Sequence, residues 1–85
     1  MEPHMIQDGV RNRTRQTRLS LGISQAFMAK DSDVHRCSYN QWELGMIDLS
    51  DEQLKRINDS LRKAVELRLG QLLKQFATPA TEEQI

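Results

Sequence analysis

The hydrophobic residues of this chain recur at helical spacing, and no segment alternates in the manner of a β-strand. The longest regular run lies in the second half. It is preceded by Ser50-Asp51-Glu52-Gln53, a capping box with two acidic residues in the first helical turn. We therefore predict a helix from about residue 51 to Thr78-Pro79, with Gly70 as a candidate break between a fourth and a fifth helix. Its apolar residues are Leu54, Ile57, Leu61, Val65, Leu69, Leu72 and Phe76.

Three shorter helices are predicted before this one. Residues 9–21 lie between Asp8, a suitable N-cap, and Gly22, a suitable stop. Ser24 caps a helix over residues 25–31, and a helix over residues 35–44 ends at Gly45. Together these elements predict an all-α fold, a compact four- to five-helix domain with a central helix-turn-helix and an extended C-terminal helix. The inward-facing residues of the first helix would be Val10, Thr14, Thr17 and Leu21, and those under the helix-turn-helix would be Met28, Ala29, Val34, Tyr39 and Trp42.

Composition limits the classes of function. The 12 basic and 12 acidic residues balance to a formal net charge of zero, which argues against a purely electrostatic nucleic-acid binder. The charges are nevertheless unevenly distributed, because residues 9–30 carry five basic side chains and no acidic one. Screening limits the reach of a charge to roughly 8–10 Å at physiological salt, so this basic segment remains significant for a nearby phosphate.

Chemistry-bearing residues are few. Cys37 is the single cysteine, which excludes an internal disulfide and is typical of a reducing compartment, so we expect a cytoplasmic protein. His35 and Cys37 alone cannot build a tetrahedral metal site. No nucleophile–base pair, phosphate loop or apolar run of roughly 20 residues occurs, so we predict no enzyme activity, no cofactor, no metal and no membrane span.

The segment between residues 24 and 45 reads SQAFMAKDSDVHRCSYNQWELG and carries a family resemblance. The motif that carries the resemblance opens with Arg18, Gly22, Ile23, Ser24 and Gln25. It closes with Trp42-Glu43-x-Gly45, with no insertion between. Through this motif the chain resembles the phage-repressor (Cro/cI-like, XRE) helix-turn-helix family over roughly residues 10–61. At the turn, Ser32 and Asp33 stand where the family usually has leucine and glycine, which predicts a looser or differently shaped turn.

The resemblance implies a reading helix over residues 35–44 that lies in the major groove of DNA. The family's base-contacting positions correspond to Arg36, Cys37 and Gln41, with Ser38 and Asn40 alongside. Arginine can bond bidentately to guanine, and glutamine or asparagine to adenine. The alternative is a solvated helix face without a ligand.

The resemblance also implies residues that hold the backbone of DNA or orient the reading helix. Gln25 occupies a position that contacts phosphate in the family, at a helix N-terminus that favours an anion. Arg18 and Glu43 occupy positions that form a buried ion pair, which we interpret as structural. An exposed, weak pair is the competing interpretation. The further candidate phosphate contacts are Arg11, Arg13, Arg15, Lys30 and His35.

These patterns together predict four segments along the chain. Residues 1–8 are expected to be a flexible N-terminal arm, 9–61 a helix-turn-helix DNA-binding domain, 62–77 a C-terminal helix and 78–85 a disordered tail. The apolar stripe continues past what so small a domain can cover, which indicates a dimer interface, although folding back within the chain is the alternative. The interface residues would be Val65, Leu69, Leu72, Leu73 and Phe76.

These features favour a homodimeric, sequence-specific regulator that binds double-stranded DNA at a palindromic operator, and they favour a repressor of a promoter on a phage or plasmid over an activator. A protein-interaction module of the antitoxin type, which also binds DNA, is one alternative. An architectural or recombination-directing DNA binder is another.

Overall fold

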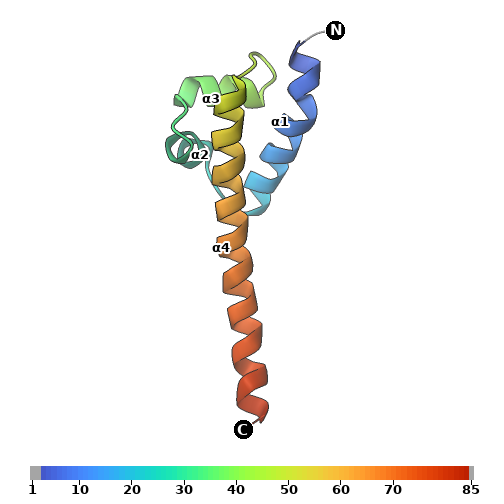
Figure 1. The fold of residues 1–85 in the computed structure, drawn as a ribbon, viewed down its shortest axis with the longest axis vertical. Coiled ribbons are helices and arrows are strands. Elements are labelled where there is room, and N and C mark those ends of the chain that lie inside the picture. Colours follow the sequence, from blue (N-terminus) through green and yellow to red (C-terminus); the bar gives the residue numbers. More distant parts are fainter. Residues whose placement is uncertain (1–2, 85) are drawn as a thin grey trace.

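The computed structural model describes residues 3–84, and the side chains of residues 7–76. The described part of the chain consists of four helices, α1 (Pro3–Ser20), α2 (Gln25–Asp31), α3 (Arg36–Glu43) and α4 (Asp51–Gln84), and contains no strand (Figure 1). α1 and α2 each pack against both α3 and α4. The C-terminal half of α4 extends beyond the other three helices. The predicted all-α class, with a central helix-turn-helix and an extended C-terminal helix, is confirmed.

α1 begins earlier than the sequence pattern predicted. Its first residue is Pro3, so residues 3–8 belong to the helix and not to an arm; residues 1 and 2 lie outside the described residues. Proline is well suited to a first helical turn, because the N–H that it lacks would have no partner inside the helix there. Asp8 therefore lies inside α1 and is not its N-cap.

α4 is a single helix that starts where predicted. Ser50 Oγ accepts a hydrogen bond from Gln53 N at 3.1 Å, and Gln53 Oε1 accepts one from Ser50 N at 2.9 Å, which completes the capping box. The helix does not break at Gly70, and it includes residues 78–84, which were expected to form a tail. Glycine lowers helix stability by only about 1 kcal/mol and presents no steric barrier, so a continuous helix can carry it.

The two helix-ending glycines act as predicted. Gly22 and Gly45 both have positive φ, +70° and +82°. Residues without a side chain adopt this left-handed conformation without steric cost, and it lets the chain turn back on the last carbonyls of α1 and α3. Ile23 N accordingly bonds to Arg18 O at 3.0 Å, and Met46 N to Gln41 O at 2.9 Å.

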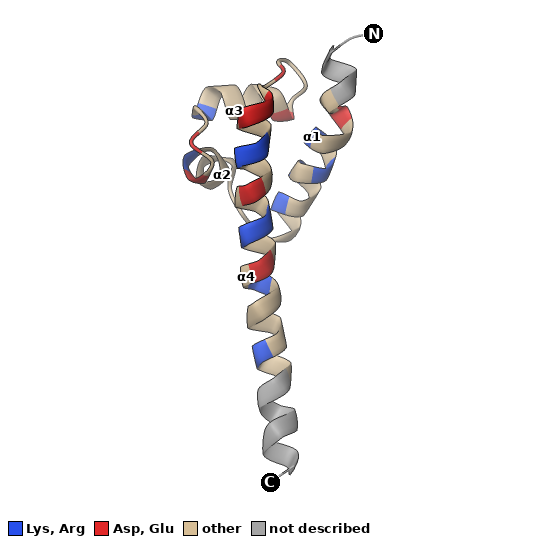
Figure 2. Cartoon of the chain, in the orientation of Figure 1, with Lys and Arg blue, Asp and Glu red and all other residues tan. Residues whose placement is uncertain are grey.

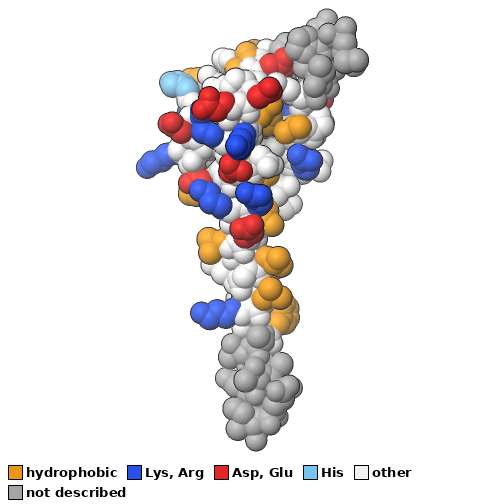
Figure 3. Space-filling model, viewed as in Figure 1, with side chains coloured by type: hydrophobic (Ala, Val, Ile, Leu, Met, Phe, Trp, Pro, Cys, Tyr) orange, Lys and Arg blue, Asp and Glu red, His pale blue; other side chains and the backbone are white. Residues whose placement is uncertain are grey.

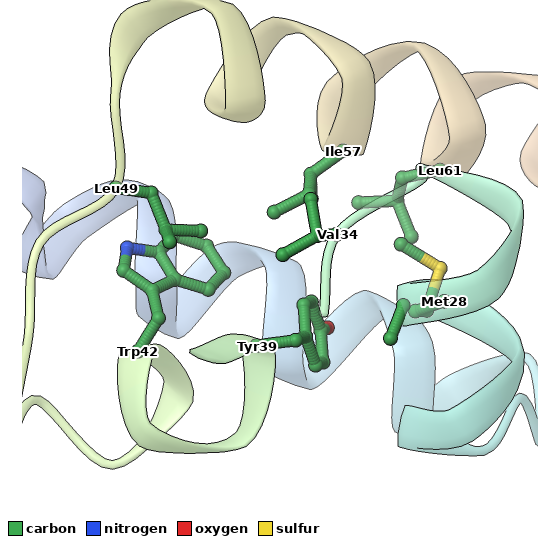
Figure 4. Packing of buried hydrophobic residues seen from close by; sticks show 8 residues of the cluster. Met28, Val34, Tyr39, Trp42, Leu49, Ile57 and Leu61 are labelled. Carbon is green, nitrogen blue, oxygen red and sulfur yellow. The ribbon is translucent and has the colours of Figure 1, made fainter. Parts of the chain in front are cut away.

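The hydrophobic core lies where α2, α3 and α4 meet (Figure 4). Tyr39 and Trp42 point from α3 toward Ile57 and Leu61 of α4. Both rings are completely buried, with centroids 5.9 Å apart in a tilted arrangement. The predicted core is therefore confirmed; it comprises Met28, Ala29, Val34, Tyr39 and Trp42, and Leu49, Ile57 and Leu61 complete it.

The inner face of α1 is polar, unlike the predicted one. Of the expected inward residues Thr14 is buried, whereas Val10, Thr17 and Leu21 are half-buried; Val10 packs against the hydrophobic core. The centre of the face is a row at spacings of four, three and four residues, which places all four members on one side of a helix. Its members are Gln7, Arg11, Thr14 and Arg18. The apolar pattern could not reveal this face, because Gln7, Arg11 and Arg18 contact α3 and the loop after it through hydrogen bonds.

Candidate nucleic-acid interface

α3 exposes one polar face and buries the other. His35 caps its start, since His35 Nδ1 accepts a hydrogen bond from Cys37 N at 3.2 Å. Tyr39 and Trp42 are fully buried, and Arg36, Cys37 and Gln41 are exposed. The outer face of α3 points away from α4, because the two rings lie between the helices (Figure 4). A short helix with this exposure can enter a groove about 12 Å wide with its outer side chains first.

The candidate base-reading residues are not equally available. Arg36, Cys37 and Gln41 are exposed, while Ser38 and Asn40 are half-buried. Among the described residues, Asn40 Oδ1 is buried without a hydrogen-bond partner. A bidentate contact to adenine requires both ends of the amide, so Asn40 cannot make the contact suggested for it in this conformation. Arg36, Cys37 and Gln41 remain as candidate base-reading side chains.

Arg18 and Glu43 form the expected ion pair between α1 and the end of α3. Arg18 Nε lies 2.8 Å from Glu43 Oε2, and Arg18 Nη2 lies 3.0 Å from Oε1, a bidentate arrangement. Both side chains are buried. Arg18 Nη1 also donates to Ile23 O at 2.9 Å, and Gln25 Nε2 donates to Glu43 Oε1 at 3.1 Å. The carboxylate of Glu43 thereby joins α1, α2 and α3.

The ionised form of Glu43 is favoured despite its burial. Desolvation alone would raise the pKa of this carboxyl, but the hydrogen bonds from Arg18 and Gln25 outweigh it and hold the pKa below its ordinary value. The hydrogen bond to Glu43 raises the pKa of Arg18 in turn. Burial raises the pKa of the neighbouring Tyr39 hydroxyl, which therefore stays neutral. The pair is accordingly a fixed charge arrangement at neutral pH.

Arg11 was expected to contact phosphate, and this expectation is wrong. Its side chain is 3% exposed, with the guanidinium carbon 5.7 Å from the centroid of the Trp42 ring. It donates to the Trp42 carbonyl and to Ile47 O, the latter at 3.1 Å, and pairs with Asp8. A guanidinium committed to these inward contacts is withdrawn from a phosphate outside, so Arg11 is structural.

Gln7 completes this group of contacts and was not identified from the sequence. Its Oε1 accepts hydrogen bonds from Trp42 Nε1 at 2.8 Å and from Leu49 N at 3.2 Å, and its Nε2 donates to Leu49 O at 2.9 Å. The signal that could have found it is spacing, because Gln7, Arg11 and Arg18 lie on one face of a helix. These three side chains, which we call the α1 clamp, hold the last turn of α3 and the loop that follows it.

The remaining candidate phosphate contacts are distributed over several surfaces. Arg13, Arg15, Lys30 and His35 are all exposed. Arg15 and Gln25 line one groove between α1 and the end of α3, together with Asn12 and Leu44, which the sequence had not singled out. Arg13 is two residues from Arg15 and therefore faces nearly the opposite side of α1. The groove thus brings Arg15 and Gln25 together beside the end of α3, whereas His35 lies at its start.

The turn between α2 and α3 is firmly held, contrary to the looser turn that its residues suggested. Asp33 adopts a left-handed conformation with φ of +57°, which aspartate tolerates better than most side chains. Ser32 Oγ donates to Met28 O, and Arg56 of α4 donates to Ser32 O at 2.9 Å and to Asp33 O at 3.2 Å. These hydrogen bonds stabilise the turn with Ser32 and Asp33 at the positions where the family usually has leucine and glycine.

The balanced total charge conceals a division between helices. Figure 2 shows acidic and basic residues alternating along the outward side of α4, whereas basic residues predominate on α1. Two ion pairs lie along α4, Glu52 with Arg56 at 3.2 Å and Asp59 with Arg62 at 3.6 Å. Acidic and basic side chains therefore offset each other along α4, whereas arginines outnumber acidic residues on α1. Within the described residues, no helix combines the length and apolar character that a bilayer span requires.

Comparison with known proteins agrees with this geometry. The family model described as Helix-turn-helix matches residues 15–67, which is more than half of the 85-residue chain. No curated protein and no solved structure gave a match. The matched segment contains α2, α3, the ion pair and the half of α4 that closes the core. On this match, the chain belongs to the XRE-type, Cro/cI-like helix-turn-helix family of DNA-binding transcription regulators.

Proposed function

We propose that this protein is a sequence-specific, homodimeric repressor that inserts α3 into the major groove of a palindromic operator. The observation that carries the proposal is the division of α3 into two faces. Its buried face is anchored by Tyr39 and Trp42, both fully inaccessible, and its outer face presents Arg36, Cys37 and Gln41 to solvent. Side chains on a braced helix can reach base edges without losing the order that specific readout requires.

The assignment of roles follows from the chemistry of these three side chains. The guanidinium of Arg36 can donate two parallel hydrogen bonds to guanine O6 and N7, and the amide of Gln41 can bond to adenine N6 and N7. Each such contact contributes about 1–3 kcal/mol of discrimination. Cys37 is small and weakly polar, which suits contact with a thymine methyl group. Ser38, which is half-buried, stays a candidate at the margin of this surface.

Phosphate contacts are proposed for the residues beside α3. Arg15 and Gln25 share the groove next to the Arg18–Glu43 pair, and Gln25 lies in the first turn of α2. His35, at the start of α3, and Lys30 and Arg13 are exposed further away and are weaker candidates. Binding should weaken steeply with salt, because each phosphate neutralised by a basic side chain releases counterions.

A repressor needs only to occupy a promoter, which a dimer of this DNA-binding domain can do by itself. This favours repression over activation. The context of a phage or plasmid promoter is proposed on the strength of the family resemblance.

The experiment is selection of random DNA duplexes by gel shift with the full chain, followed by affinity measurements on the selected site. Arg36→Ala and Gln41→Ala should each weaken binding to that site by about 5- to 150-fold and relax the preference at one base pair. Arg62→Ala is the matched control, because Arg62 is exposed on α4. If both α3 variants bind the selected sites as tightly as the unmodified protein, α3 does not read the bases.

A further inference from the structure

The apolar residues of α4 change face where the helix leaves the domain. Ile57 and Leu61 are buried against α3 and α2, with 1% and 7% exposure. Beyond them, five large apolar side chains on one side of α4 are exposed by 36–74%, and Leu67 is exposed on the other side. We call this set the distal stripe; it consists of Val65, Leu69, Leu72, Leu73 and Phe76. Figure 3 shows hydrophobic side chains gathered mainly along one side of this extension.

The centre of the distal stripe is rotated about α4 from the centre of the face that packs on the core, although Leu72 lies close to the direction of Leu61. At 3.6 residues per turn, Val65, Leu69, Leu72 and Phe76 centre about a quarter of a turn away from the direction of Ile57. Beyond Ala64, the positions that continue the direction of Ile57 are polar, and they are Arg68, Gln71 and Gln75. The stripe therefore faces sideways relative to the line from α4 to α3, which suits a partner beside α4 and not beneath it.

We propose that the distal stripe pairs with the same stripe of a second copy in antiparallel orientation, an inference that rests on the proposed function. Residues 65, 69, 72 and 76 are spaced by four, three and four, the repeat by which two helices keep one seam in contact. In the antiparallel register that buries all four, Val65 lies opposite the second copy's Phe76, and Leu69 opposite the second copy's Leu72. Shifting one copy by seven residues leaves half of these side chains without an apolar partner.

The sideways direction of the stripe selects antiparallel over parallel pairing. Two parallel helices are related by a two-fold axis that runs along them, which would point the two α3 helices to opposite sides. Two antiparallel helices are related by an axis perpendicular to the plane that contains both. Because the stripe lies about a quarter of a turn from the core direction, that axis points from α4 toward α3. Both reading helices then face the same side, as one duplex requires.

The register also gives a spacing along the duplex. Ile57 is about 20 Å along α4 from the midpoint between residues 70 and 71, at 1.5 Å per residue, so the two domains are about 40 Å apart. Successive major grooves on one side of DNA are about 34–36 Å apart. α3 crosses α4 at a large angle (Figure 1), and a helix in the major groove runs across the duplex axis, so α4 and that axis lie roughly parallel. We expect half-sites about 10–12 base pairs apart, centre to centre.

The area is sufficient for a weak specific dimer. With side chains that expose 36–74% of their surface, complete burial of two stripes would remove on the order of 1,000 Å² from water. That lies at the lower limit for a specific protein–protein interface. DNA that engages both domains at once would strengthen the assembly, because the second contact becomes intramolecular.

One experiment tests the surface with matched charge substitutions. Leu69→Glu lies in the stripe, and Leu67→Glu is the control, because Leu67 is 66% exposed on nearly the opposite side of α4. Leu69→Glu should give a monomer in sedimentation at all concentrations and about 100-fold weaker binding to the selected palindrome. Leu67→Glu should change neither. Equal effects of the two variants, or an unchanged dimer with Leu69→Glu, would overturn the proposal.

A second experiment tests the orientation, in a Cys37→Ser background that removes the natural thiol. An equimolar mixture of Val65→Cys and Phe76→Cys chains should form the mixed disulfide on mild oxidation. Phe76→Cys chains alone should not cross-link, because antiparallel pairing separates the two positions by about 16 Å along the helix. The reverse pattern would establish parallel pairing and overturn the proposal.

The two proposals fail separately. If the unmodified protein is monomeric but selects a specific half-site that depends on Arg36 and Gln41, the proposed readout stands and the antiparallel dimer is wrong. If it forms the antiparallel dimer but selects no sequence, the dimer stands and the proposed readout is wrong. A complex that forms only with a different protein, with no self-association, would also overturn the pairing and favour the antitoxin-type alternative.

Discussion

The two sides of α3 are held by different kinds of interaction. Toward α2 and α4, Tyr39 and Trp42 pack in the core with apolar side chains, Met28 of α2 and Ile57 of α4 among them. Toward α1, the last turn of α3 is held by the α1 clamp, through hydrogen bonds to Trp42 and a bidentate ion pair with Glu43. Apolar burial is non-directional and supplies most of the stability, whereas hydrogen bonds depend on angle and distance. The comparison suggests that packing holds α3 in the domain and that the clamp fixes its orientation toward DNA.

The largest effect is expected from the apolar side. Trp42→Ala should lower the free energy of unfolding by about 3–5 kcal/mol, because it leaves a cavity and removes the hydrogen bond that Trp42 Nε1 donates to Gln7. For a small domain this is a large part of the total stability. Urea denaturation followed by circular dichroism would measure it. Leu44→Ala, at a position 73% exposed near the end of the same helix, is the control and should change stability by no more than about 0.5 kcal/mol.

The ion pair should give a smaller effect with a distinctive pH dependence. Glu43→Gln leaves the buried Arg18 charge uncompensated and should lower the free energy of unfolding by about 3 kcal/mol at neutral pH. The pKa of Glu43 is lowered in the fold, so its ionisation stabilises the protein above the ordinary value of 4.5. That contribution is lost as pH falls through the lowered pKa.

Denaturation curves from pH 7 downward would therefore show the difference between the unmodified protein and Glu43→Gln shrinking in acid. Glu66→Gln, at an exposed position on α4, is the control and should show no such convergence. A constant difference at every pH would show that packing around the side chain, and not its charge, accounts for the loss.

The smallest stability effect, and the sharpest test of the comparison, is expected from Gln7. Gln7→Ala removes three hydrogen bonds and leaves the buried Trp42 Nε1 without its acceptor. This should lower the free energy of unfolding by about 1–2 kcal/mol. If the clamp fixes orientation, affinity for the selected operator should fall by more than affinity for unrelated DNA. Gln16→Ala is the matched control, because Gln16 is exposed on the same helix. Equal losses on both kinds of DNA would mean that the clamp contributes stability alone.

The sequence determined those features that depend on local chemistry or on a single periodic face. Ser50 and Gln53 defined the start of α4, Gly22 and Gly45 ended two helices, and the apolar positions of α2 and α3 identified the core. The pairing of Arg18 with Glu43 was inferred by resemblance and is present in the structure.

Only the tertiary structure decided what each polar residue of α1 does. Arg11, Arg13 and Arg15 are equivalent in the sequence, yet Arg11 is buried over Trp42 while the other two are exposed. Its role depends on where the Trp42 carbonyl and the loop after α3 lie, and no local pattern encodes a contact across 31 residues. Likewise, Arg56 holds the turn of the helix-turn-helix from a helix 23 residues away. Hydrophobic periodicity shows which residues are removed from water, whereas the partner of a buried polar group is set by the three-dimensional packing that surrounds it.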